Sequence, residues 1–159
     1  MKHMILPILM IWIIQGELVF GQGFNLSFGS CLHQEKELAL LSKAADQLPN
    51  AFVFLGDNIY ADTYDSMRIN KAYQALACNL NFQTLKRSVP LYATWDDHDY
   101  GMDDVGKYYP LKEASKRMFT SFFQPPNPVQ LLSHEGIYQS YRFRYRGKKI
   151  QLILLDTRT

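Results

Sequence analysis

The sequence is poor in cysteine and nearly balanced in charge, and both properties exclude classes of protein. Two cysteines among 159 residues are too few for a disulfide-stapled scaffold. Seventeen basic and 15 acidic residues give a net charge of +2, which gives no indication of nucleic-acid binding. Internal repeats and low-complexity tracts are also absent. The composition that remains, 47% hydrophobic and 20% charged, is typical of one globular domain.

Only one apolar run is long enough to need separate treatment, and it lies near the N-terminus. Lys2 precedes an apolar stretch over residues 4–14, and small residues follow at Val19 and Gly21. This pattern predicts a secretory signal peptide over residues 1–21, a mature domain over 22–159 and a secreted or organelle-lumen location. The run is too short to span a bilayer, and no other segment predicts a stable membrane span. A buried first strand or an uncleaved anchor is the alternative.

The mature part alternates apolar strands with amphipathic helices, which predicts an α/β layered fold. Prolines at 125, 126 and 128 predict a loop. The last strand reads as buried on both faces, yet the chain stops four residues after it, so we expect a piece of a longer domain. The predicted strands cover 24–30, 51–55, 90–95, 141–146 and 150–155, and the predicted helices cover 35–48, 66–79 and 111–123.

Polar side chains follow four of the predicted strands. In open α/β sheets ligands bind outside the carboxyl ends of the strands, so these side chains are candidates for one site. Residues 96–104 contain five carboxylates, which repel one another unless cations neutralise them. A dication is the economical partner, although a solvated acidic loop is the usual outcome for such a run. The side chains at the strand ends are Cys31, His33, Asp57, Asn58, Tyr60, Asp96, Asp97, His98, Asp99, Asp156 and Arg158.

Four motifs in these positions resemble, in order and spacing, those of the alkaline phosphatase D (PhoD-like) branch of the metallophosphoesterases. The resemblance extends from about Leu26 to the last residue. Two departures are visible: Met102-Asp103-Asp104 stands where many relatives have Asn-Asp, and the family's later histidine motif would lie beyond Thr159. The motifs are Phe28-Gly29-Ser30-Cys31, Gly56-Asp57-Asn58-Ile59-Tyr60-Ala61-Asp62, Trp95-Asp96-Asp97-His98-Asp99-Tyr100-Gly101 and Leu155-Asp156-Thr157-Arg158.

The resemblance implies a four-layer α/β/β/α sandwich, apparently truncated here after about half of the domain, that hydrolyses phosphoesters with a metal-bound hydroxide. It implies that Cys31 and Tyr60 bind iron and that Asp57 bridges two metals. It makes Asp97 a ligand of the second metal, and Asp97 and His98 the catalytic pair. Thiolate and tyrosinate favour Fe³⁺, and carboxylates suit Ca²⁺, Mn²⁺ or Mg²⁺. Asn58, Asp96, Asp99, Asp156 and Arg158 are expected to support the ligands or to contact substrate.

Several of these residues also have simpler interpretations. Cys31 could pair with Cys78 in a disulfide, although we expect a free thiolate. His33, His134 and the basic run over residues 142–149 are interpreted as solvated positions.

The sequence thus predicts a phosphomonoesterase or phosphodiesterase that acts on small-molecule phosphoesters. A non-catalytic fragment or a binding protein on the same fold is the alternative, and this chain alone is expected to be inactive if it is truncated. A Ser-His-Asp esterase is disfavoured because no Gly-x-Ser-x-Gly elbow is present.

Overall fold

A computed structural model describes residues 23–159, and the predicted signal peptide lies outside the described residues. Three strands, β1 (Leu26–Gly29), β2 (Ala51–Leu55) and β3 (Leu91–Thr94), form a parallel sheet in the order β1-β2-β3. Two further strands, β4 (Gln139–Tyr145) and β5 (Lys148–Leu154), form an antiparallel hairpin. The helices are α1 (Ala39–Asp46), α2 (Ser66–Cys78), α3 (Leu80–Ser88), α4 (Asp97–Tyr100), α5 (Lys112–Phe123) and α6 (Pro128–Ser133).

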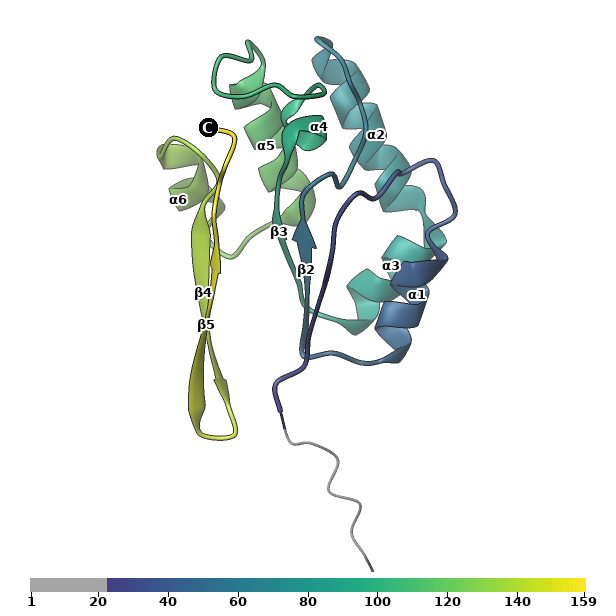
Figure 1. The fold of residues 1–159 in the computed structure, drawn as a ribbon, viewed down its shortest axis with the longest axis vertical. Coiled ribbons are helices and arrows are strands. Elements are labelled where there is room, and N and C mark those ends of the chain that lie inside the picture. The colour runs from purple at the N-terminus through teal and green to yellow at the C-terminus, as the bar shows by residue number, and fades with distance from the viewer. Residues whose placement is uncertain (1–22) are drawn as a thin grey trace, which may run out of the picture.

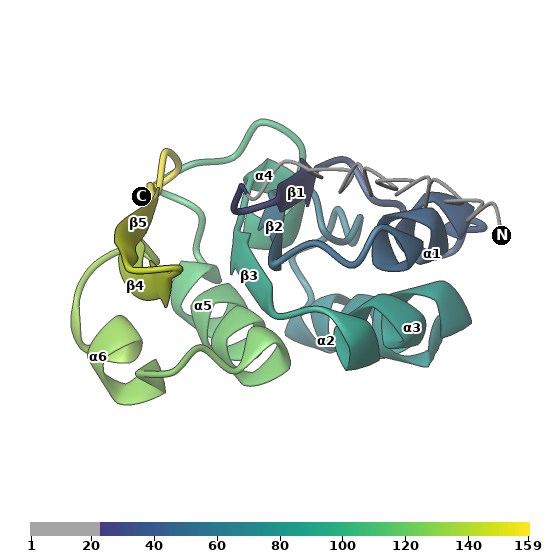
Figure 2. The ribbon, with the colours of Figure 1, turned by 90° about the horizontal axis from the view of Figure 1, so that it is seen from below.

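The parallel sheet is the centre of the fold (Figure 1). Its middle strand, β2, pairs with both neighbours. The first residue pair is Leu26↔Ala51 in the register with β1 and Phe52↔Leu91 in the register with β3. The first four residues of β2 are buried, as its wholly apolar sequence predicts. Figure 2 shows α1, α2 and α3 on one side of the sheet and the hairpin on the other. The predicted mixed α/β architecture is therefore confirmed, whereas the four-layer sandwich stays a prediction.

Three helices were not predicted, α3, α4 and α6, and each begins at a recognisable signal. The one-turn helix α4 follows Asp96, whose side chain accepts a hydrogen bond from the backbone N–H of Asp97. Asn79 ends α2 and also starts α3, because its side chain accepts hydrogen bonds from the backbone N–H groups of Asn81 and Phe82. Helix α6 begins at Pro128, a residue favoured in the first helical turn. The prolines at 125 and 126 do form a loop, but the third one starts a helix instead of continuing that loop.

The hairpin differs from its prediction, because β5 is not buried on both faces. Its residues alternate, so that Leu154 is buried while Ile153 is 60% exposed. The buried side is aromatic: Tyr92 of β3 packs against the rings of Tyr141 and Phe143, at centroid distances of 4.4 and 5.4 Å. The hairpin therefore has one face against the parallel sheet and one face in solvent.

No helix among residues 23–159 is long and apolar enough to cross a membrane.

Candidate metal centre

The carboxyl ends of the three parallel strands bring the predicted site residues to one edge of the sheet. Cys31 follows β1 and Asp57 follows β2, and the Cys31 Sγ lies 3.5 Å from the Asp57 Oδ2. Backbone bonds hold the two strand ends together, from the Cys31 N–H to the Gly56 carbonyl and from the Leu32 N–H to the Asp57 carbonyl. Cys31 and Asp57 both have positive φ, at 58° and 52°. Such backbone strain in non-glycine residues is common at functional sites.

Gly56 allows the end of β2 to approach the end of β3. Its φ is 110°, and a Cβ at this position would lie 2.6 Å from the Cβ of Asp96 and 2.8 Å from its backbone nitrogen. No larger residue fits without moving backbone. The glycine therefore sets the close spacing of Asp57 and Asp96.

Three carboxylates meet at this edge. One oxygen from each of Asp57, Asp96 and Asp97 lies within 4.8 Å of the others. The Asp57 Oδ2 accepts a hydrogen bond from the Tyr60 hydroxyl at 3.0 Å, but its Oδ1 is buried and has no hydrogen-bond partner among the described residues. A buried carboxylate oxygen without a donor, beside two further carboxylates, fits the oxygen ligands that a hard cation requires.

Arg158 forms ion pairs with two of these carboxylates. Its Nε donates to the Asp96 Oδ1 at 2.5 Å, and its Nη2 donates to the Asp97 Oδ1 at 3.0 Å. The second Asp97 oxygen accepts the backbone N–H of Asp104 at 2.6 Å. Burial works against ionisation of Asp97, but these hydrogen bonds and the Arg158 charge hold its pKa below the usual value. Asp156 does not reach the carboxylates; it accepts the backbone N–H groups of Ile137 and Arg158.

Asp99 joins the loops after β2 and β3. It is fully buried, and its carboxylate accepts the backbone N–H groups of Asn58 and Asp96 at 3.0–3.1 Å. Burial raises the pKa of Asp99 to about 7, although those two hydrogen bonds favour the ionised form. The Asn58 side chain donates in turn to the Thr94 carbonyl at 2.9 Å. Asn58 and Asp99 therefore position the carboxylates and lie away from solvent.

Tyr60 is held from two sides. Gln34 bonds its backbone reciprocally, because the Gln34 side chain donates to the Tyr60 carbonyl and accepts the Tyr60 N–H, at 2.9 and 2.8 Å. The Tyr60 ring packs between His33 and His98, at centroid distances of 5.3 and 4.1 Å. Burial and the Asp57 carboxylate raise the pKa of the Tyr60 phenol well above its usual value, so Tyr60 is a neutral hydrogen-bond donor here.

His98 forms a pair with Asp62, a residue to which the sequence assigned no role. The two side chains meet at 2.6 Å through the histidine Nδ1, and the Nε2 lies 3.9 Å from a carboxylate oxygen of Asp103. Burial lowers the pKa of His98, but the hydrogen bond to Asp62 and the charges of Asp62, Asp57 and Asp97 together raise it more, so the net shift is upward. Asp97, His98 and Asp103 also form a second group with ligand atoms within 4.8 Å of one another.

The structure thus brings together Cys31, Asp57, Tyr60, Asp96, Asp97, His98 and Arg158, with Asn58, Asp99 and Asp156 supporting them. Sequence reasoning missed Gln34 and Asp62 as partners; the only signal was the place of Asp62 at the end of the Gly56–Asp62 motif. Asp103 belongs to the acidic run over residues 96–104, and the structure places it near His98. His33 is not merely solvated, because it stacks on Tyr60. His134 instead stacks on Tyr138 beside the hairpin. Cys31 and Cys78 are both free thiols.

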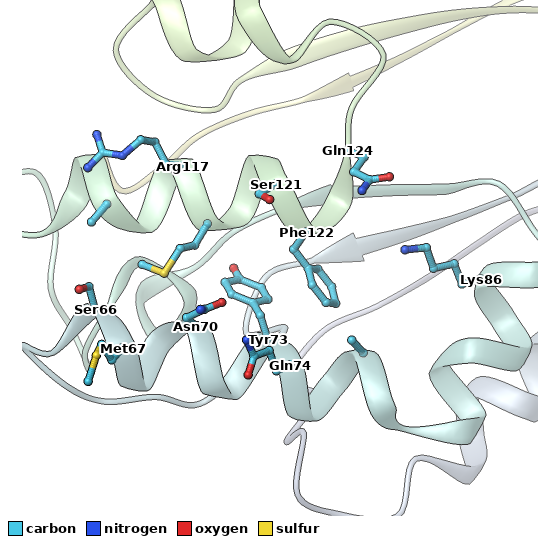
Figure 3. A pocket seen from close by; sticks show the side chains of 13 residues that line it. Ser66, Met67, Asn70, Tyr73, Gln74, Lys86, Arg117, Ser121, Phe122 and Gln124 are labelled. Carbon is cyan, nitrogen blue, oxygen red and sulfur yellow. The ribbon is translucent and has the colours of Figure 1, made fainter.

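A separate groove of about 570 Å³ lies between α2 and α5 (Figure 3). Tyr73 and Phe122 form its floor, and Arg117 and Lys86 stand toward opposite ends. None of the predicted site residues lines it, so the carboxylate cluster and this groove are distinct features.

No family model and no curated protein matches the sequence. A solved structure described as "Structure of PhoD" aligns with 78% of this chain, at a TM-score of 0.54 and 16% sequence identity. The aligned part covers 29% of the PhoD chain. At this identity the likeness concerns the fold alone. The described residues therefore have a PhoD-like partial fold, with a parallel sheet whose strand ends carry an acidic cluster that could hold a metal ion.

Proposed function

We propose that this protein is a metal-dependent hydrolase of small-molecule phosphoesters. The observation that carries the proposal is the meeting of Asp57, Asp96 and Asp97 around a buried Asp57 oxygen that has no donor. Carboxylates this close together favour a bound dication. The PhoD-like fold and the motifs that resemble alkaline phosphatase D favour a phosphoester as the substrate. The apolar run over residues 4–14 favours a secretory location.

In this proposal Asp57 would be a ligand common to two ions. Cys31 and Tyr60, which both contact the Asp57 Oδ2, would hold Fe³⁺ with it. Asp57 and Asp97 would hold Ca²⁺, Mn²⁺ or Mg²⁺. Bound ions of this kind supply an activated water and stabilise charge on a reacting phosphoryl group. Tyr60, which is neutral here, would bind Fe³⁺ as a phenolate, so metal binding would release its proton to solvent.

The protein's own contribution to the chemistry would come from His98 and Arg158. Asp62 accepts a hydrogen bond at the His98 Nδ1 and favours the protonated ring, which leaves the Nε2–H free to donate a proton to a leaving oxygen. Arg158 supplies a fixed positive charge beside Asp96 and Asp97, where it could pair with phosphoryl oxygens.

A metal-binding protein without catalysis is the second candidate. One observation favours it: both oxygens of Asp97 already have donors, in Arg158 and in the backbone of Asp104. Those donors would have to be displaced before Asp97 could coordinate an ion.

A turnover assay separates the two candidates. The purified protein is incubated with a chromogenic phosphate monoester or diester, in EDTA or with added Fe³⁺, Ca²⁺ or Mn²⁺, and bound metal is measured by elemental analysis. We expect turnover only with metal. His98→Asn should lower kcat by about 10²–10⁴-fold, as loss of a general acid does, whereas His134→Asn should not. Bound metal without turnover of either ester would favour the non-catalytic candidate.

A further inference from the structure

The outer face of the β4–β5 hairpin carries an unbalanced positive charge. Residues 136–155 contain five cations and no carboxylate. The strand register places Arg142 opposite Gln151 and Arg144 opposite Lys149, and all four side chains are exposed. Like charges directly opposite each other in a sheet are destabilising, and neither Arg144 nor Lys149 has an ion-pair partner among residues 23–159.

The hairpin turn carries a cationic residue in a backbone conformation that most side chains disfavour. Arg146 and Gly147 are the two turn residues, with φ of 47° and 77°. Turns with positive φ at both positions strongly prefer Asn-Gly or Gly-Gly, because most side chains are strained there. A residue kept in a strained conformation suggests a use other than stability. Here the strained residue places a positive charge at the tip of the hairpin.

The same face becomes apolar toward the base of the hairpin. Ile153 and Leu155 follow Lys149 and Gln151 at alternate positions, and they are 60% and 67% exposed. With Tyr138, which is 53% exposed, they line a hollow of about 540 Å³ beside α6. One face therefore combines a basic half with an aliphatic half.

Hydrogen bonds and an aromatic contact anchor the hairpin. The Gln139 side chain donates to the Ala93 carbonyl at 3.1 Å, and the Thr94 hydroxyl donates to the Leu155 carbonyl at 2.8 Å. Phe24 stacks on Phe143 at 5.6 Å, which supports the inner face nearer the turn. Figure 1 shows the turn at the opposite end of the molecule from α4, so the basic half of the face lies away from the carboxylate edge.

We propose that this outer face docks on an anionic lipid surface. Basic side chains pair with anionic headgroups, and neighbouring aliphatic side chains insert at the boundary of the acyl chains. Nucleic acid is the less suitable partner, because single strands are bound by aromatic side chains and the aromatic residues of the strands point to the inner face. This proposal is independent of the proposed hydrolase activity.

Vesicle co-sedimentation tests the proposal. The protein is mixed with phosphatidylcholine vesicles that contain phosphatidylserine, and with pure phosphatidylcholine vesicles, at low and high salt. The apolar run over residues 4–14 would bind both kinds, so the readout is the difference between them. We expect preferential binding to the anionic vesicles that weakens with salt. Each cation near the surface is worth about fivefold in partition, so R142Q/R144Q/R146N should lose roughly a hundredfold.

Three controls make the outcome decisive. The variant K36Q/R68Q/K71Q removes the same charge from exposed positions elsewhere and should keep most of the binding. Arg146→Asn alone should weaken binding without lowering Tm, because asparagine suits the turn better. I153S/L155S should weaken binding to vesicles. Equal loss of vesicle binding in both triple variants would overturn the proposal. A second refuting outcome is tight binding to a DNA oligomer or a sulfated polysaccharide, together with unchanged vesicle binding in I153S/L155S.

Discussion

Replacing Asp57 by asparagine should make the metal-free protein more stable and abolish its stabilisation by metal. The three carboxylates lie within 4.8 Å of one another, and at an effective dielectric constant of about 20 a pair at that distance repels by roughly 3 kcal/mol. Arg158 offsets the charges of Asp96 and Asp97 but does not bond to Asp57. Allowing for partial solvent exposure, removal of the Asp57 charge should stabilise the metal-free fold by about 1–2 kcal/mol.

The backbone should tolerate this substitution. Asp57 has φ of 52°, a conformation in which asparagine is as well suited as aspartate. The amide oxygen can still accept the Tyr60 hydroxyl, and the new amide N–H₂ group can donate toward the neighbouring carboxylates. The gain should raise Tm by about 3–8 °C for a domain of this size.

Thermal unfolding followed by circular dichroism measures both effects. In EDTA, Asp57→Asn should melt above the parent protein. With Mn²⁺ or Ca²⁺ at about a hundred times its Kd, the parent should gain about 2.7 kcal/mol and the variant almost nothing. Glu37→Gln, an exposed position with the same change of charge, is the matched control and should change neither value. A variant that melts lower in EDTA, or that responds fully to metal, would refute the cation site.

Two further outcomes follow from the same geometry. Gly56→Ala should lower the free energy of unfolding, measured by chemical denaturation, by about 2–4 kcal/mol, because its Cβ would overlap Asp96. Gly147→Ala has open space around it and should lower the free energy of unfolding by about 1 kcal/mol, from its positive φ alone. Asp62→Asn should lower the pKa of His98, as measured by NMR titration, and an unchanged titration would contradict the pairing. Because Asp62 raises that pKa, the stability that the pair contributes is present at low pH and is lost as the pH rises through the pKa of His98. The variant should therefore be destabilised mainly below that pH.

The location of the candidate site could be predicted from the sequence because parallel strands share one carboxyl edge. Cys31, Asp57 and Asp96 each lie one or two residues after a predicted strand, so the sheet alone brings them together. The partners of Tyr60 and His98 could not be predicted. Gln34 and Asp62 lie in loops, and their positions depend on how those loops cross the edge of the sheet.

Elements were missed where one residue or one strand can be interpreted in two ways. The predicted helix over residues 66–79 ends where α2 ends, but Asn79 also caps α3, which follows at once. The apolar residues of β5 read as a buried strand, because a single sequence does not reveal that Ile153 and Leu155 point away from the parallel sheet.

Asp99 fixes the distance between the two loops that carry the carboxylates. One buried side chain accepts a backbone N–H from each loop, at Asn58 and at Asp96, so neither loop can shift without breaking a hydrogen bond inside the protein. An ion bound between Asp57 and Asp96 would therefore meet carboxylates whose separation is fixed. Ca²⁺ binds its ligands at about 2.3–2.6 Å and Mg²⁺ at about 2.0–2.1 Å. A rigid frame of this kind discriminates between ions by their radius, whereas a flexible loop would adjust to either.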